Sequence, residues 1–477
     1  MIVPSLIRLS PSSAVPMYLQ IANSLIAHIQ SGVLKKGIRL PGTRQLADAL
    51  HVHRKTVQSA YDELQAQGWI DVLPQRGSFI AEVLPEVVPA PFGRNEPGSV
   101  APVVPDLPFN STIVIPQTIR ERIAFNDGLP DVRLAPREEL ARLYSTYIRF
   151  GEPAVLQYGS VFGQARFREV FSRYLNETRG LKTGPENLLT TRGSQMGLYL
   201  AGLALLHPGD CVIVGELNYR AANMTLETLG ARLQTVPVDD DGLDIDAVEA
   251  LCRQMPVKAL YVTSHHYHPT TVTLKPERRV RLIALANRYR FFIIEDDYDY
   301  DFHYANRPVL PLASADRNVI YLGSFTKRLA PAFRVGYVAG PEELIAEMAK
   351  HRRIIDRQGD SILELCLADM LENGALKRHA SKALKIYRQR RDLACELLTH
   401  YLGDAIRFQV PEGGLAIWAR FDPSVDLPLL SQKAAAKGVY LSNGAAYPGL
   451  NACRMGFAAL NEKELTEGVQ LLARCLA

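Results

Sequence analysis

Apolar positions between residues 16 and 81 first follow the spacing of amphipathic helices and then that of short strands. A first helix is predicted in VPMYLQIANSLIAHIQSGVL, with inward positions at Tyr18, Ile21, Ala22, Leu25, Ile26 and Ile29. A second helix is expected to start near Thr43 as its N-cap, and a third starts near His53 and stops at Gly68. The runs WIDVL and SFIAE, joined by a turn at PQRG, predict two strands. Three helices followed by a two-stranded wing indicate a winged helix-turn-helix.

Beyond about residue 119 the pattern changes to short continuous apolar runs that alternate with helical stretches. The runs are CVIVGE, ALYVTSHH, FFIIEDD, VIYLGSF and VGYVAG. Each predicts a strand that is buried on both faces, and the helices between them predict an α/β fold with a mostly parallel sheet. Several runs end in polar residues, where ligands bind in open sheets of this kind.

A proline-rich stretch separates the two patterns. Residues 82–116 contain eight prolines and show little periodicity, which is typical of an extended linker. We therefore predict a DNA-binding domain at residues 12–81, a linker at 82–118 and a ligand-binding domain at 119–477.

Charge supports a difference in role between the two ends. Residues 1–81 hold eight Lys and Arg against four Asp and Glu, whereas the remainder carries equal numbers of each sign. A basic surface on a winged helix favours double-stranded DNA as a partner. The six scattered cysteines, the lack of a signal-peptide pattern and the lack of a long apolar run predict a cytoplasmic protein with no membrane segment.

Polar residues at the predicted strand ends match the needs of pyridoxal 5'-phosphate (PLP). This cofactor requires a lysine amine for a Schiff base, a carboxylate beside its pyridine nitrogen and a cradle for its phosphate. Lys327 in YLGSFTKRLAPAFRVGY supplies the amine, and Asp296 at the end of FFII supplies the carboxylate. The cradle is predicted from Ser194 and Gln195 at a helix start together with Ser324, Thr326 and Arg334. Tyr219 is placed to stack on the ring, and Tyr298 to reach the ring hydroxyl.

These motifs carry a resemblance that covers nearly the whole chain. Residues 119–470 resemble the fold type I aminotransferases, a class with a smaller C-terminal domain, and residues 12–81 resemble the GntR family of winged-helix repressors. Joined in this order, with FNDGLPDVRLAP, QYGSVFGQARFREVFSRYL and IIEDDYD, they resemble the MocR family of transcription regulators. The resemblance implies that Lys327 is the internal aldimine lysine and that Tyr158 reaches the phosphate region of a neighbouring subunit. It also implies that Arg454 in CRMGFAAL binds a carboxylate of the effector.

One loop, HHYHPTTVTL, departs from the family pattern. His266 aligns with the family's histidine and is predicted to contact the cofactor or a ligand, whereas Thr271 stands where glycine is usual. Three histidines between His265 and His268 also raise the alternative of a metal site. No partner cluster is visible in the sequence, and we predict no metal.

The DNA-contacting residues are predicted from the winged-helix resemblance. They are Arg44, Arg54, Lys55 and Thr56 on the second and third helices, with Arg76 and Gly77 in the wing. His53 stands where relatives place a serine cap, which predicts a weaker cap.

The combined prediction is a homodimeric regulator of the MocR type that binds promoter or operator DNA and senses PLP, an amine effector, or both, through aldimine exchange at Lys327. The alternative is a working PLP-dependent aminotransferase with an accessory DNA-binding head, because nothing essential for a half-reaction is missing. A cofactor-free binding module is a third reading, disfavoured by the intact phosphate residues.

Overall fold

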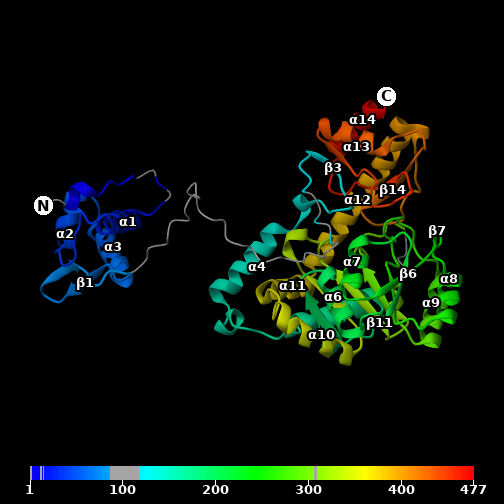
Figure 1. Cartoon of the computed structure of the whole chain (residues 1–477), viewed down its shortest axis with the longest axis horizontal. Coiled ribbons are helices and arrows are strands. Elements are labelled where there is room, and N and C mark those ends of the chain that lie inside the picture. The colour runs from blue at the N-terminus through cyan, green and yellow to red at the C-terminus, as the bar shows by residue number, and fades with distance from the viewer. Residues whose placement is uncertain are drawn as a thin grey trace, which may run out of the picture. The chain divides into compact units, whose positions relative to one another are not determined.

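The computed structural model describes residues 3–10, 13, 15–85, 113, 115, 118–305 and 309–476. The chain divides into two units, Met1–Asn110 and Ser111–Ala477, which are described separately below (Figure 1). Most of the proline-rich stretch predicted as a linker, 82–118, lies outside the described residues.

The first unit contains the predicted three helices and wing. Its elements are α1 (Met17–Gln30), α2 (Thr43–Leu50), α3 (Arg54–Ala66), β1 (Ile70–Leu73) and β2 (Gly77–Ile80). The strands are antiparallel, with Ile70 opposite Ile80. Apolar residues of all three helices, including Ile21, Leu46 and Val57, share one buried core with Trp69 at the base of the wing.

Helix capping in the first unit differs from the sequence prediction at α2. Thr43 is the first residue of α2 rather than its cap, and Gly42 takes the N-cap position without a side-chain hydrogen bond. His53 does cap α3, because its Nδ1 accepts a hydrogen bond from the Lys55 backbone N–H at 3.2 Å. The imidazole therefore fills the capping role, and the weaker cap that we expect of histidine stays a prediction.

The second unit is built on a seven-stranded sheet in the order β4-β12-β11-β10-β9-β5-β6. The strands are β4 (Leu188–Thr191), β5 (Cys211–Gly215), β6 (Arg232–Val236), β9 (Ala259–Val262), β10 (Phe292–Asp297), β11 (Val319–Ser324) and β12 (Gly336–Ala339). All five apolar runs of the sequence form strands here. Only β12 runs antiparallel to both of its neighbours, so the sheet is mostly parallel, as predicted.

Helices cover both faces of this sheet, which explains why its strands are apolar on both sides. One buried cluster joins the sheet to α6 (Ser194–Leu205), α7 (Arg220–Thr228) and α10 (Glu342–Ile355). Another joins it to α8 (Ile245–Gln254) and α9 (Pro276–Tyr289). Helices α4 (Arg137–Phe150), α5 (Ala165–Arg179) and α11 (Ser361–Glu372) pack together beside the β4–β12–β11 side.

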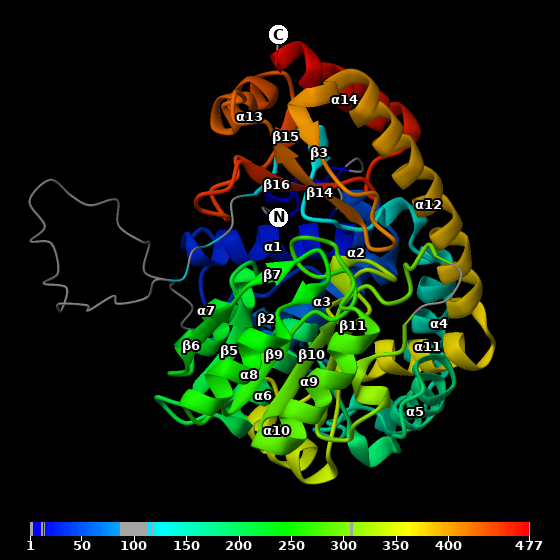
Figure 2. The same ribbon diagram turned by 90° about the vertical axis from the view of Figure 1, so that its right-hand side faces the viewer.

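A smaller C-terminal domain forms the other end of the second unit (Figure 1). It comprises β13 (Ile406–Arg407), β14 (Ala416–Phe421), β16 (Ala452–Gly456), α13 (Leu427–Ala436) and α14 (Glu462–Leu476), with β15 (Val439–Leu441) parallel to β3 (Ile123–Phe125). The 28-residue helix α12 (Ala375–Leu402) runs along one side of the unit from α11 to this domain (Figure 2). A short hairpin, β7 (Val238–Asp239) and β8 (Gly242–Leu243), completes the strands described.

The described helices include no segment with both the length and the apolar character needed to cross a bilayer. All six cysteines are buried and unpaired.

Candidate functional site

A cavity of about 510 Å³ lies at the carboxyl ends of the sheet strands in the second unit. Nine of the residues predicted to hold a cofactor line it together: Ser194, Gln195, Tyr219, Asp296, Tyr298, Ser324, Thr326, Lys327 and Arg334. They come from the last residues of β10 and β11, from the helix starts and loops that follow β4, β5, β10 and β11, and from the turn before β12. The volume of the cavity is in the range of pockets that bind small ligands.

Lys327 and Asp296 are the two ionisable groups at the centre of the cavity lining. The Lys327 Nζ donates to the Gly128 carbonyl oxygen at 2.7 Å. Burial lowers the pKa of this amine, and the carboxylate of Asp127 opposes that shift. Burial also raises the pKa of Asp296 to about 7, although a hydrogen bond from the Tyr261 hydroxyl at 2.9 Å acts in the opposite direction. The other oxygen of Asp296, Oδ1, is buried and has no partner in the described part of the chain.

The predicted phosphate residues gather at the N-terminus of α6. Ser194 and Gln195 open this helix after Gly193, whose φ of 86° is a conformation that favours glycine. The Arg334 guanidinium donates to the Arg192 carbonyl oxygen at 2.7 Å. It also lies close to Gly193, because a Cβ at that position would be 2.8 Å from Arg334 Nη2. A guanidinium beside free helix N–H groups is suited to an anion.

On the opposite side of the same anion-binding region, two hydroxyls are held in place by each other. Ser324 Oγ donates to Thr326 Oγ1 at 2.8 Å and accepts from the Thr326 backbone N–H at 3.0 Å. The Gln195 side-chain amide instead donates a hydrogen bond to the Thr225 hydroxyl. The group of Gln195 that remains for an anion is therefore mainly its backbone N–H.

Aromatic rings form the walls of the cavity. The Tyr219 ring lies 5.1 Å from the His268 ring in an edge-to-face arrangement, and both residues line the cavity. Tyr298 donates from its hydroxyl to the His266 carbonyl oxygen at 3.0 Å, and Lys327 Nζ lies 5.8 Å from the Tyr298 ring centre.

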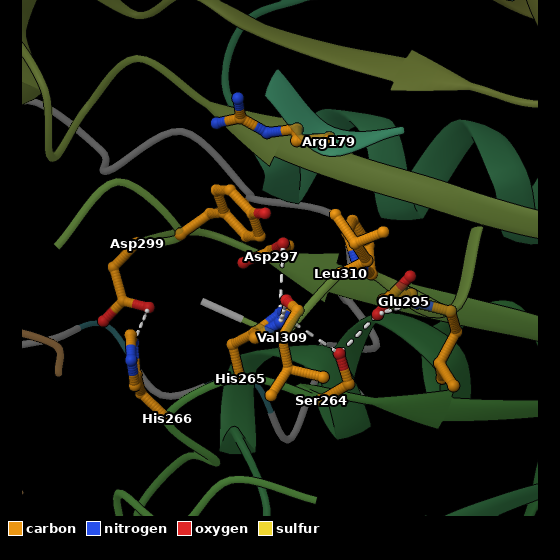
Figure 3. Close-up of polar contacts among 12 residues, drawn as sticks. Arg179, Ser264, His265, His266, Glu295, Asp297, Asp299, Val309 and Leu310 are labelled. Carbon is orange, nitrogen blue, oxygen red and sulfur yellow. Dashed lines mark hydrogen bonds and ion pairs between the residues drawn. The ribbon is translucent and has the colours of Figure 1, made fainter. Parts of the chain in front are cut away.

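The histidine loop differs from the sequence prediction, because His268 lines the cavity and His266 does not. The His266 side chain points toward Asp299, with Nδ1 and Oδ1 2.9 Å apart (Figure 3). Its ring also stacks on the His303 ring. His265 lies between the Asp297 carboxylate and the Val309 carbonyl oxygen. The cofactor contact that we expected of His266 does not fit this geometry, because the His266 side chain points to the buried Asp299 carboxylate and does not line the cavity.

Each histidine of the loop has its own carboxylate partner, Asp297 for His265, Asp299 for His266 and Asp127 for His268. Within the described ranges no group of three or more His, Cys, Asp or Glu side chains could hold a metal ion. Thr271, which stands where glycine is usual, has a φ of 65° and so keeps the backbone conformation of a glycine.

Arg454 on β16 is buried beside the same loop, with 4% of its surface exposed. Its Nη1 donates to the Pro269 carbonyl oxygen at 3.1 Å, and its Nε lies 2.7 Å from Asp127 Oδ1. Asp127 Oδ2 also lies 3.1 Å from His268 Nε2, and it accepts a hydrogen bond when the imidazole carries a proton on that nitrogen. Sequence reasoning did not identify Asp127 or His268, although Asp127 lies within the quoted motif FNDGLPDVRLAP.

Tyr158 lies apart from this cavity. Its side chain is 76% exposed, and the Arg357 guanidinium lies 4.1 Å from its ring centre. Exposed apolar side chains accompany it nearby in sequence, at Phe150 and Leu156.

The predicted DNA-contacting residues in the first unit share an accessible surface. Arg44, Arg54, Lys55 and Arg76 are exposed, and Thr56 and Gly77 are partly exposed. Gly77 has a φ of 104°, and a Cβ there would lie 3.1 Å from Arg39 Nε. Arg39 therefore lies against the wing and is a further candidate for a DNA contact. The basic residues between α1 and α2, Lys35, Lys36 and Arg39, could have indicated this from the sequence.

Comparison with known proteins relates both units to established families. Residues 137–472 match the model for aminotransferase class I and II, and residues 17–80 match the model for bacterial regulatory proteins of the gntR family. The probable rhizopine catabolism regulatory protein MocR of Rhizobium meliloti is 30% identical over 471 residues, which is 96% of this chain and 93% of that protein.

Solved structures resemble the second unit. The multiple substrate aminotransferase of Thermococcus profundus is 30% identical, with a TM-score of 0.69, over 74% of this chain and 91% of its own. The kynurenine aminotransferase of Pyrococcus horikoshii, solved in complex with PMP, is 28% identical, with a TM-score of 0.69, over 74% of this chain and 90% of its own.

Proposed function

The chain belongs to the aminotransferase class I and II family. Because a gntR-family domain precedes the aminotransferase-like domain in the same chain, we propose that it regulates transcription in response to PLP, a primary amine, or both. It is a DNA-binding regulator of the MocR type, with a GntR-family head and an aminotransferase-like domain. Promoter DNA is its target, and the cytoplasm is the compartment in which such a regulator would act. The observation that carries the sensing proposal is the single cavity that joins Lys327, Asp296 and the anion-binding residues around Arg334.

The residues of this cavity fit pyridoxal 5'-phosphate, the cofactor of the family. Asp296 Oδ1 is buried without a partner among the described residues, as an acceptor for a ring N–H would be. The start of α6 and the Arg334 guanidinium supply donors for a phosphate. When bound, this cofactor supplies an aldehyde that condenses with primary amines and a ring that withdraws electrons.

Within that cavity Lys327 would provide the amine that faces the aldehyde. Burial lowers the pKa of Lys327, which increases the fraction of neutral, nucleophilic amine. Gly128 orients this amine through its carbonyl oxygen, and Tyr219 and Tyr298 would bound the ring. Ser324, Thr326, Ser194 and Gln195 would hold the phosphate end.

Arg454 is the residue that would anchor a carboxylate if the effector carries one, because a buried guanidinium beside the cavity offers paired donors. A homodimer is proposed from the exposed apolar side chains near Tyr158, which a second copy would cover while Tyr158 completes its cavity. The DNA contacts are assigned to Arg44, Arg54, Lys55, Thr56, Arg76 and Gly77. His266 is assigned an indirect part, because its carbonyl oxygen accepts the Tyr298 hydroxyl.

A working aminotransferase is the second candidate, favoured by the presence of Lys327, Asp296 and Arg454 in and beside one cavity. One experiment separates the two. The full-length protein, reconstituted with pyridoxal phosphate, is screened with primary amines by visible absorption, and each amine that changes the spectrum is tested on promoter binding and transcription.

The regulator is supported if such an amine changes transcription, and if Lys327→Ala keeps DNA affinity but loses that response. Steady turnover of an amino acid with 2-oxoglutarate, without any effect of amines on transcription, would instead identify an enzyme. A full response in Lys327→Ala would rule out exchange at this lysine as the signal.

A further inference from the structure

The loop at residues 126–129 contacts both groups that an amino-acid ligand would use. Asp127 lies 2.7 Å from the Arg454 guanidinium, and the next residue, Gly128, accepts the Lys327 amine through its carbonyl oxygen at 2.7 Å. Asp127 also lines the cavity, and its side chain keeps 55% of its surface exposed there. The chain thus places its own carboxylate where the ligand's carboxylate would bind.

This loop is held in a defined conformation. Asn126 Oδ1 accepts from the Leu129 backbone N–H at 2.7 Å, and the Asn126 carbonyl oxygen accepts from Gly456 at 2.7 Å. Gly128 has a φ of 79°, and a Cβ at this position would lie 3.3 Å from Arg454 Nη2. The backbone of this loop is therefore fixed against β16, and it places the Asp127 side chain within reach of Arg454.

The energetics of the pair disfavour a second carboxylate. A buried guanidinium such as Arg454 requires a counter-charge, and Asp127 supplies it. A ligand carboxylate that took this place would leave the Asp127 carboxylate close to a like charge. His268 could relieve that repulsion only if it were protonated, but burial lowers its pKa despite the attraction of Asp127. An amine without a carboxylate leaves the Asp127–Arg454 pair intact.

We propose that Asp127 is a specificity-determining residue that makes the cavity select primary amines without a carboxylate beside the amino group. A carboxylate-bearing amine must displace Asp127 from Arg454 before it can use that guanidinium. This inference rests on the proposed amine sensing and narrows the class of effector.

The test compares two amines that differ by one carboxylate, ethylamine and L-alanine. Each is titrated into the full-length protein loaded with pyridoxal phosphate, and the concentration that gives half of the change in visible absorption is measured. Wild type, Asp127→Asn and Asp127→Ala are compared. Asp240→Asn is the matched control, because it removes an exposed acid from the turn between β7 and β8.

We expect both Asp127 variants to lower the half-effect concentration of L-alanine by about tenfold or more, equivalent to about 1.4 kcal/mol. The value for ethylamine should change less than twofold, and the Asp240 control should match wild type. Two results would overturn the role of Asp127 but not amine sensing. One is an ethylamine response in which the ratio of the half-effect concentrations of the two amines is the same in wild type and the Asp127 variants. The other is an ethylamine response with no L-alanine response in any variant. Absence of a response to both amines in every protein overturns amine sensing itself.

Discussion

Replacing Asp296 with asparagine should make the cofactor-free protein more stable and the cofactor weaker to bind. Asp296 is buried at the end of β10, beside the carboxylates of Asp297 and Asp299, which raise its pKa further. Asparagine has the same shape and can still accept the Tyr261 hydroxyl, but it carries no charge. The substitution therefore separates the stability cost of the buried charge from its use in the site.

The magnitude follows from the pKa of Asp296, which is raised from 3.8 to about 7 mainly by burial. That difference corresponds to about 4 kcal/mol of unfolding free energy. Because the folded-state pKa of Asp296 is raised, this amount of about 4 kcal/mol of unfolding free energy is present in the wild type below about pH 4. It is lost as the pH rises from about 4 to about 7, and it is absent above about pH 7. The asparagine NH2 group is buried, and leaving its N–H donors without partners costs about 1–3 kcal/mol. We therefore expect Asp296→Asn to raise the unfolding free energy by a net amount of about 1–3 kcal/mol at pH 8.

Urea unfolding of the cofactor-free protein at pH 5 and pH 8, followed by circular dichroism, measures this gain. It should be larger at pH 8 than at pH 5, and Asp240→Asn should be neutral at both. Titration with pyridoxal phosphate at pH 8 should show about 10- to 150-fold weaker binding to Asp296→Asn, because a charge-assisted hydrogen bond worth about 1.5–3 kcal/mol is lost. A variant that is destabilised equally at both pH values, with unchanged cofactor affinity, would refute the reasoning.

Three further predictions concern the DNA-binding head and the histidine loop. Arg44→Ala and Arg54→Ala should each weaken operator binding by about 1–3 kcal/mol in a mobility-shift titration, with Arg407→Ala as the unaffected control; unchanged affinity in both would remove these residues from the interface. His53→Ala should destabilise the head by about 1 kcal/mol in thermal unfolding and His53→Ser should restore it, whereas equal stability of all three would show that the imidazole is not a cap. Thr271→Gly should stabilise the second unit by about 1 kcal/mol, since φ is 65° there, and a loss of stability would contradict the strain argument.

Much of the fold could be predicted because its signals are local. Five apolar runs were long enough to mark β5, β9, β10, β11 and β12, and the three-helix head followed from helical spacing and a turn. The direction of β12 could not be read from its residues, because an apolar strand buried on both faces has the same composition whether it runs parallel or antiparallel. Its orientation is set by the short connection after Lys327, which leads from the carboxyl end of β11 directly into β12, between β11 and β4.

The cavity was predictable in part for the same reason. Residues that follow parallel strands meet at one edge of the sheet, so Asp296 and Lys327 could be brought together from the sequence alone. The side-chain directions in the histidine loop could not be predicted, because they depend on partners elsewhere in the chain, Asp299 for His266 and Asp127 for His268. The Asp127–Arg454 pair joins residues more than three hundred positions apart, and no local pattern indicates it.

The covalent site of the cofactor is the most direct test of the account. The full-length protein is loaded with pyridoxal phosphate, reduced with borohydride and digested, and the modified peptide is identified by mass spectrometry. We expect one modified peptide, carrying Lys327, and none from Lys327→Ala. Modification of a different lysine, or equal labelling of Lys327→Ala, would contradict the assignment of the cavity.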